Sequence, residues 1–256
     1  MKKKLFLLLF TSLFILAVFL LTPDVALAIS TKGVSSTVNN LLGGNSSSGQ
    51  TINIFLMLTF LSFIPLLLIM TTSFTRIIMV LSFTRSALGT SQNPPNQVLL
   101  GLALFLTFFI MRPVYTNIYN QAIVPYEQQQ ITQQQAIDRS EVRIKKFMYK
   151  QTRSKDIQLF ISESSKPNQK YNSYKSIPLT IITPAFILSE LRTAFSIGFL
   201  IFIPFLIIDL VVSSVLMSMG MVMLPPVMIS LPFKLLLFVL SDGWYLLVES
   251  LIKGFN

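Results

Sequence analysis

The chain has 256 residues, of which 52% are hydrophobic and only 12% are charged, and its mean hydropathy is positive. These values are typical of proteins that insert into or assemble at membranes, and they argue against an ordinary soluble domain. The chain contains no cysteine and no histidine, which excludes disulfides, thiolate chemistry and the common zinc sites. We therefore expect no enzymatic activity, no cofactor and no metal site.

The net charge of +10 raises the possibility of a nucleic-acid partner. Ten of the twenty Lys and Arg residues, however, lie between Arg139 and Lys175, and five acidic residues fall between Glu127 and Glu163. Mixed charges of this kind are typical of a solvated helical face, and no pattern of interleaved aromatic residues accompanies them. We expect no nucleic-acid partner.

Residues 1–28 have the features of a secretory signal peptide. A basic start, Lys2 to Lys4, precedes an apolar run from Leu5 to Leu21, and Ala26 and Ala28 have the spacing of a cleavage site. We predict cleavage after Ala28. An uncleaved membrane anchor is the alternative, because the apolar run is slightly longer than a usual signal core.

The remaining chain divides into four segments by composition. Residues 29–51 are rich in Ser, Asn and Gly and predict a flexible leader. Residues 52–118 predict a first hydrophobic helical hairpin, residues 119–178 a polar extracytoplasmic insert, and residues 179–256 a second hydrophobic hairpin. The expected fold is all-α, without a β-sheet.

In the first hydrophobic segment, the sequence NPPNQ at residues 93–97 predicts a turn, and Asn93 or Asn96 is able to cap the helix that follows. Arg76 and Arg85 precede this turn. A role as membrane-surface anchors is one interpretation of these two arginines.

The insert combines a predicted helix with a predicted loop. Residues 164–176, SSKPNQKYNSYKS, predict the loop. If the signal peptide directs the mature N-terminus outward, the insert lies outside as well, although its basic excess runs against the positive-inside tendency. The predicted helix is amphipathic, with packing positions at Ile137, Ile144, Phe147, Met148 and Gln151.

Charged residues interrupt the apolar segments after residue 179. A spanning helix needs about 20 apolar residues, and each charge at the hydrocarbon centre costs at least about 2.5 kcal/mol on the insertion scale. Residues two apart on a helix point in different directions, so Glu190 and Arg192 need partners elsewhere. We interpret the following as charges that pair between helices or between subunits: Glu190, Arg192, Asp209, Lys234 and Asp242. An ion or proton pathway is the alternative.

Residues 217–226, MSMGMVMLPP, place a methionine at every second position and end in two prolines. Gly220, Pro225 and Pro226 argue against a continuous helix and favour a loop between two antiparallel helices. Irregular backbone in an apolar assembly persists only where it is buried in protein or lines a cavity. Filler in a hairpin turn and a compliant seal are both open interpretations of the methionines, which are Met217, Met219, Met221 and Met223.

Two stretches resemble a known family. Residues 72–114, beginning TSFTRIIMVLSFTRSALG, and residues 184–255, containing SMGMVMLPPVMISLPFKLLLFVLSDGW, are similar to the FliP family of the flagellar type III export gate. The similarity covers nearly everything after residue 52, and the second stretch is the more specific of the two.

The resemblance implies an all-helical subunit of the bacterial inner membrane and the flagellum basal body. It implies that several copies assemble with FliQ- and FliR-like subunits and other export-apparatus membrane proteins, in contact with membrane lipid. Such an assembly forms a channel through which unfolded flagellar proteins leave the cytoplasm. It also implies that the methionine-rich loop is a gasket in the closed gate.

Members of the same family that act in virulence-type III secretion are an alternative. Those members tend to lack a long leader with a signal peptide. Residues 1–51 therefore favour the flagellar branch.

Overall fold

The computed structural model describes residues 48–90, 92–164, 171, 173–221 and 224–255. The chain divides into two compact units, residues 1–61 and 62–256. In the first unit only the start of α3 (Ser48–Met70) is described. The predicted signal peptide, with Ala26 and Ala28, and the leader as far as residue 47 lie outside the described residues.

The regular structure of the described residues is helical, and no strand occurs among them, so the predicted all-α fold is confirmed. After α3 the chain forms α4 (Phe74–Ala87), α5 (Asn96–Ile118), a π-helical turn η1 (Tyr119–Ile123), α6 (Val124–Glu127), α7 (Gln133–Gln151), α8 (Ser154–Ser162), α9 (Leu179–Ser218), α10 (Pro226–Leu240) and α11 (Gly243–Lys253).

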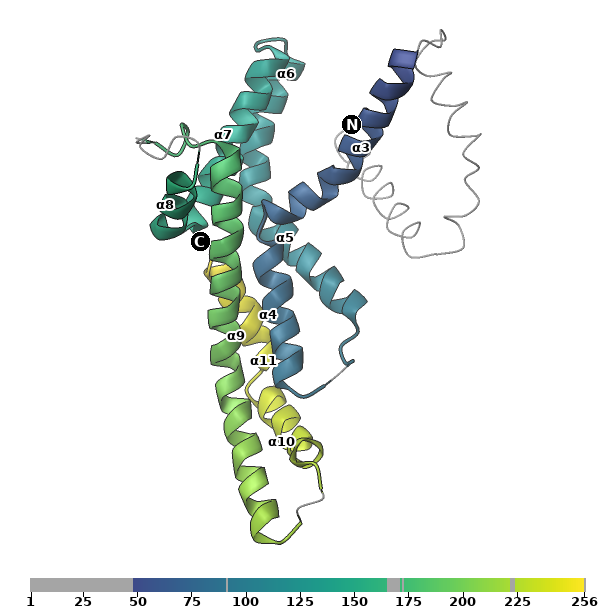
Figure 1. Ribbon diagram of the computed structural model, residues 1–256, viewed down its shortest axis with the longest axis vertical. Helices are drawn as coiled ribbons and strands as arrows, with labels where there is room; N and C mark the ends of the chain where they lie inside the picture. The colour runs from purple at the N-terminus through teal and green to yellow at the C-terminus, as the bar shows by residue number, and fades with distance from the viewer. Residues whose placement is uncertain (1–47, 91, 165–170, 172, 222–223, 256) are drawn as a thin grey trace. The chain divides into compact units, whose positions relative to one another are not determined.

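The helix α9 organises the second unit (Figure 1). It is 40 residues long and continues through Pro184 and Pro204. The helices α7 and α8 pack against its first half, α4 packs along its middle, and α10 packs against its last part. The charged residues Arg192 and Asp209 lie within the apolar sequence of α9, and the helix continues through both of them.

The helices α4 and α9 pack tightly at Gly198. A Cβ atom at this position would lie 2.6 Å from Cδ2 of Phe83, which leaves no room for any side chain. The ring of Phe83 also lies 5.0 Å from the ring of Phe195, centroid to centroid. Glycine at this position therefore lets the two helices pack with their backbones close together.

Two main hydrophobic clusters hold the second unit together. One joins α4, α5, α9 and α11 and has buried members that include Ile77, Leu81, Leu99, Ala194 and Leu251. The other joins α7, α8 and the start of α9 and has buried members that include Met148, Ile157, Ile182, Ala185 and Phe186. The polar insert is thus packed onto α9 through its own core.

The predicted amphipathic helix of the insert corresponds to α7. A capping box begins it: Thr132 Oγ1 accepts a hydrogen bond from the Gln135 amide, and the Thr132 amide donates to Gln135 Oε1. Met148 is buried, whereas Ile137 is exposed, so the prediction was wrong for Ile137. The first turns of α7 lie beside η1 and not over the second cluster.

The predicted asparagine cap of α5 is wrong. The residue at the N-cap is Pro95, which makes no side-chain capping bond, and Asn96 is the first residue of the helix. Asn96 Oδ1 instead accepts a hydrogen bond of 2.5 Å from Arg85 Nη1. A proline carbonyl accepting the first helical bonds leaves the asparagine free to bind the arginine of the preceding helix.

Candidate functional site

The end of α9 forms a Schellman motif that explains Gly220. The Gly220 amide donates to the Met217 carbonyl and the Met221 amide to the Leu216 carbonyl, at 3.1 and 3.0 Å. Gly220 has a φ of +72°, a left-handed conformation that glycine adopts at little cost. Met217 therefore belongs to the last turn of α9, and the turn itself begins at Met219.

The start of α10 explains the two prolines. Pro225 occupies the N-cap and Pro226 the first helical position, where a missing amide hydrogen costs nothing and the fixed φ suits the helix. The three residues predicted to break the helix thus lie at the end of one helix and the start of the next. Together they form a sharp reversal at the far end of α9 (Figure 1).

The methionine side chains at this reversal point away from the core of the chain. Met217 is 70% exposed, Met219 65% and Met221 44%. Met223 lies outside the described residues. Within one chain the described methionines of the tip pack against little, so a filler role inside this subunit does not account for them.

An ion pair closes the α9–α10 hairpin above this tip. Lys234 Nζ lies 2.7 Å from Asp209 Oδ2, and Ser230 Oγ donates to Asp209 Oδ1 at 2.6 Å. Lys234 is buried, whereas Asp209 keeps 34% of its side-chain surface exposed. A lysine ammonium in apolar surroundings needs this carboxylate, because an unpaired buried charge is expensive.

A second ion pair lies in the first half of α9. Arg76 Nε and Nη2 donate to the two carboxylate oxygens of Glu190 at 2.8 and 2.5 Å. Arg76 Nη1 donates to the Gly254 carbonyl, and Nη2 also donates to Gln151 Oε1. Its guanidinium lies 3.9 Å above the ring of Phe255. Arg76 thus ties α4, α7, α9 and the C-terminal residues together.

The position of Arg76 differs from one interpretation of the sequence. Its interpretation as a membrane-surface anchor is wrong, because it is buried and paired with Glu190. The two residues are 114 positions apart, and no spacing rule connects them. The single available signal was that Glu190 required a cation from another helix.

The other two predicted charges have different surroundings. Arg192 is exposed on α9, and Asp242 is exposed in the turn between α10 and α11, with a φ of +51°. Neither forms an ion pair within the described part of the chain. Their pairing with another subunit stays a prediction.

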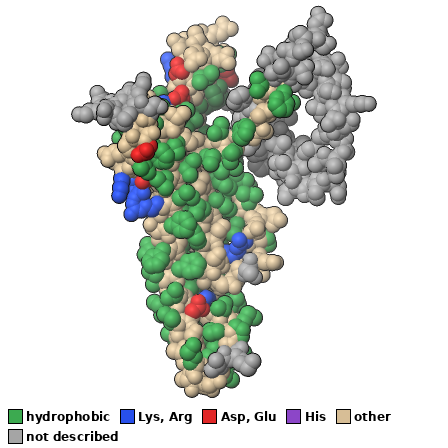
Figure 2. Space-filling view, in the orientation of Figure 1, with side chains coloured by type: hydrophobic (Ala, Val, Ile, Leu, Met, Phe, Trp, Pro, Cys, Tyr) green, Lys and Arg blue, Asp and Glu red, His purple; other side chains and the backbone are tan. Residues whose placement is uncertain are grey.

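Two helical stretches are long and apolar enough to cross a membrane. Within the described residues they are Asn96–Glu127 and Leu179–Ser218, and α10 with α11 would form a third if this pair, bent by 61°, counts as one span. Figure 2 shows hydrophobic side chains over much of the visible face of the helices, with the charged groups gathered mainly towards α7 and α8. Among the described residues, no three acidic side chains gather into a group that could hold a metal ion.

Comparison with known proteins places the chain in a family. Residues 57–251 match the FliP family. The chain belongs to the FliP family. It is 58% identical over 206 residues to the flagellar biosynthetic protein FliP of Bacillus subtilis (strain 168), covering 80% of this chain and 92% of that one. It is 53% identical over 215 residues to FliP of Pectobacterium carotovorum subsp. carotovorum, covering 84% of this chain and 83% of that one.

The family match covers nearly all of the features described above. Both ion pairs, the Schellman motif and the start of α10 lie within the matched residues. The C-terminal residues that contact Arg76 lie just beyond it. The site is therefore built on the part of the chain that is shared with FliP proteins.

Proposed function

We propose that this protein is a core subunit of the flagellar type III export gate in the bacterial inner membrane. Several copies would assemble with FliQ- and FliR-like subunits around a channel for unfolded flagellar proteins. Membership of the FliP family supports the flagellar role. The channel is proposed on the basis of the exposed surfaces of α9 and α10.

The observation that carries the proposal is the apolar surface of α9. Large hydrophobic side chains stay exposed along it even though its acidic residues Glu190 and Asp209 are paired inside the chain. An apolar surface of this extent needs lipid or a neighbouring subunit to cover it. Its exposed members are Phe195, Phe199, Leu200, Ile203, Leu206, Ile207, Leu210, Val211 and Val215.

The tip of the hairpin supports the gating part of the proposal. Methionine is unbranched and has three flexible torsions, so it fills gaps of variable shape. If several copies stand side by side, their reversals bring Met219 and Met221 into one ring. Such a ring would close an empty channel and yield to a passing chain.

Cross-linking in cells tests this function. The chain has no cysteine, so a single Phe199→Cys substitution gives a clean probe of the α9 surface. A photoreactive amino acid in place of Met219 probes the tip while a flagellar export substrate is stalled by a folded fusion domain. We expect ladders of several copies from the first probe and substrate adducts from the second.

Cells that lack the export substrate provide the control for the second probe. Substrate adducts should disappear in them, while the ladders from Phe199→Cys remain. Monomers alone from the first probe, together with lipid adducts alone from the second, would contradict the proposal.

The alternative is an ion or proton pathway formed by the charged residues Glu190, Asp209, Lys234 and Asp242. Asp209→Asn separates the two ideas. Because the substitution leaves Lys234 buried without a counter-ion, we expect fewer assembled gates. Breaking a buried ion pair typically costs about 3–5 kcal/mol of stability. Because the Asp209 side chain is 34% exposed, we expect the loss of stability here to be no larger than the lower limit of that range.

The measurement is the yield of gate complex from membranes, compared with export of a flagellar substrate. Combining Asp209→Asn with Lys234→Met should restore assembly, because no charge is then left unpaired. Normal assembly of the single variant with abolished export would favour a proton relay instead.

A further inference from the structure

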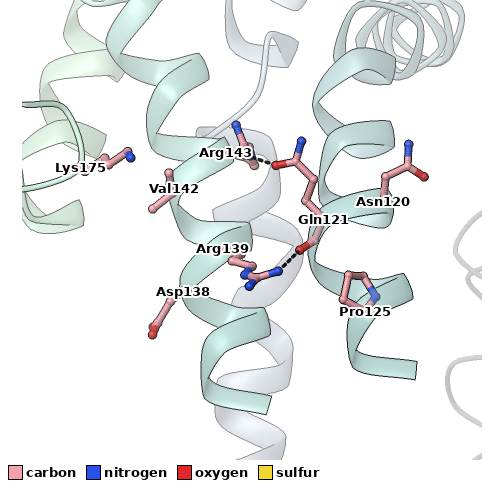
Figure 3. Close-up of a pocket in the computed structure, with 8 residues that line it drawn as sticks. All are labelled: Asn120, Gln121, Pro125, Asp138, Arg139, Val142, Arg143 and Lys175. Carbon is pink, nitrogen blue, oxygen red and sulfur yellow. Dashed lines mark hydrogen bonds between the residues drawn. The ribbon is translucent and has the colours of Figure 1, made fainter. Parts of the chain in front are cut away.

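A groove lined mainly by polar and charged residues lies between the end of the α5–η1–α6 segment and α7 (Figure 3). It has a volume of about 570 Å³ and is open to solvent. Three cationic side chains line it, Arg139, Arg143 and Lys175, against a single carboxylate, Asp138. Neither the hydrophobic cores nor the hairpin tip uses this groove.

The two arginines are fixed at the wall of the groove by one residue of η1. They are four positions apart on α7 and therefore lie on the same face of that helix. Arg139 Nη1 donates to the Gln121 carbonyl at 3.1 Å, and Arg143 Nη2 donates to Gln121 Oε1. Each guanidinium has five donors, so most of the donors stay available to a ligand.

One of those donors lacks an acceptor. Nε of Arg143 is buried and has no hydrogen-bond partner among the described residues. Nε is too deeply buried for a ligand in the groove to reach it, so a ligand would bind the other donors of the two guanidinium groups.

The third cation comes from the loop that precedes α9. Lys175 follows Tyr174, whose ring lies 6.1 Å from the ring of Tyr149 on α7. In Figure 3 its side chain extends towards Val142 and the arginines, whereas Asp138 points away from them. Asp138 Oδ1 also accepts a hydrogen bond from Gln134 Nε2. The groove therefore presents an excess of positive charge from three separate side chains.

We propose that this groove binds the phosphate group of an anionic membrane lipid. Planar guanidinium groups match the oxygens of phosphate, and pairs of this kind are the strong, charge-assisted class of hydrogen bond. On the cytoplasmic side of membranes, basic pockets between helices bind the headgroups of anionic lipids. The same attraction between Lys or Arg and phosphate applies to a basic groove on the outer side. The proposal requires α5 to enter the membrane but does not depend on the channel.

The residues of α5 support a lipid over a soluble phosphate. The exposed residues Phe105, Phe108 and Phe109 are apolar and suit hydrocarbon, and they are followed by exposed Tyr115 and Tyr119. Tyrosines are enriched where the hydrocarbon meets the headgroups. The groove follows directly at residues 120–125, on the polar side of these tyrosines.

The same proposal accounts for the basic excess of the insert. Placed outside, ten Lys and Arg residues between positions 139 and 175 run against the positive-inside tendency. Binding of headgroup phosphate gives three of them a role on that side. It would also hold the insert at the membrane surface before or during assembly.

The test uses the full chain purified in a neutral detergent and titrated with short-chain phosphatidylglycerol. We expect saturable binding that is weakened by about tenfold or more when Arg139→Gln, Arg143→Gln and Lys175→Gln are combined, since charge-assisted bonds are lost. The matched control combines Lys146→Gln, Lys150→Gln and Lys155→Gln, which removes the same charge from exposed positions outside the groove. This control should bind as the unaltered chain does.

Two further measurements separate loss of the binding site from loss of folding, and a lipid ligand from free phosphate. Lys175→Gln alone should weaken binding without disturbing the contacts of Gln121, so a loss in this variant cannot come from an undocked α7. Inorganic phosphate alone should compete only weakly; equal binding of inorganic phosphate would overturn the lipid as the source. Equal binding of phosphatidylcholine, or unchanged binding by the triple groove variant, would overturn the site.

Discussion

An Arg76→Ala variant should lose about 3–5 kcal/mol of folding stability, the range typical when one partner of a buried ion pair is removed. Glu190 has no exposed surface in this chain, and Arg76 is 4% exposed. The substitution leaves the carboxylate buried and uncompensated. It also removes the bond to the Gly254 carbonyl and the contact with the Phe255 ring.

Thermal unfolding in a mild detergent measures this loss. Arg192→Ala is the matched control, because it removes an exposed arginine two positions from Glu190 and should change stability little. A double variant, Arg76→Met with Glu190→Met, should recover much of the loss, since no charge is then left unpaired. An Arg76→Ala variant as stable as Arg192→Ala would show that the buried pair does not hold the helices together.

Replacing Met219, Met221 and Met223 together by alanine should make the assembled gate leak ions and small solutes. Each Met→Ala change at a packed site costs about 2–5 kcal/mol, so three in each of several copies would weaken the closed state. A loss of only 1.4 kcal/mol corresponds to about a tenfold rise in the open fraction. Assembly should persist, because the described methionines of the tip contribute little to the core.

Ion leak across membranes of cells that contain the assembled gate is the measurement. Met57→Ala is the control, because Met57 is also exposed but belongs to α3 and not to the reversal between α9 and α10. The amount of assembled complex must be measured in parallel. Unchanged permeability in cells that assemble normal amounts of the gate would count against a methionine seal.

The ends of α9 and α10 could be predicted because they depend on local backbone chemistry. Gly220 adopts the left-handed conformation that ends a helix, and Pro226 suits a helix start wherever it occurs. The prediction that an asparagine caps α5 was wrong because the asparagine side chain has another partner nearby. A capping side chain competes with other partners, and at Asn96 the partner was Arg85 from the preceding helix.

The partners in the ion pairs could not be predicted from residue spacing along the chain. Spacing on one helix established that Glu190 and Arg192 do not pair with each other. It did not select Arg76 from the other cations, and it did not show that Arg192 would stay exposed. The choice depends on which side of α4 faces α9, and this is set in part by the contact of Phe83 with Gly198.

The sequence by itself determined the all-α fold, the FliP resemblance and the reversal between α9 and α10. These follow from composition and from residues whose effects act within one or two turns of the chain. The tertiary structure alone decided that Arg76 is buried, that Arg192 stays exposed, and that three cations of the insert share one groove. Burial and pairing depend on contacts between residues far apart in the chain, and the free energy of those contacts is defined only once the helices have packed.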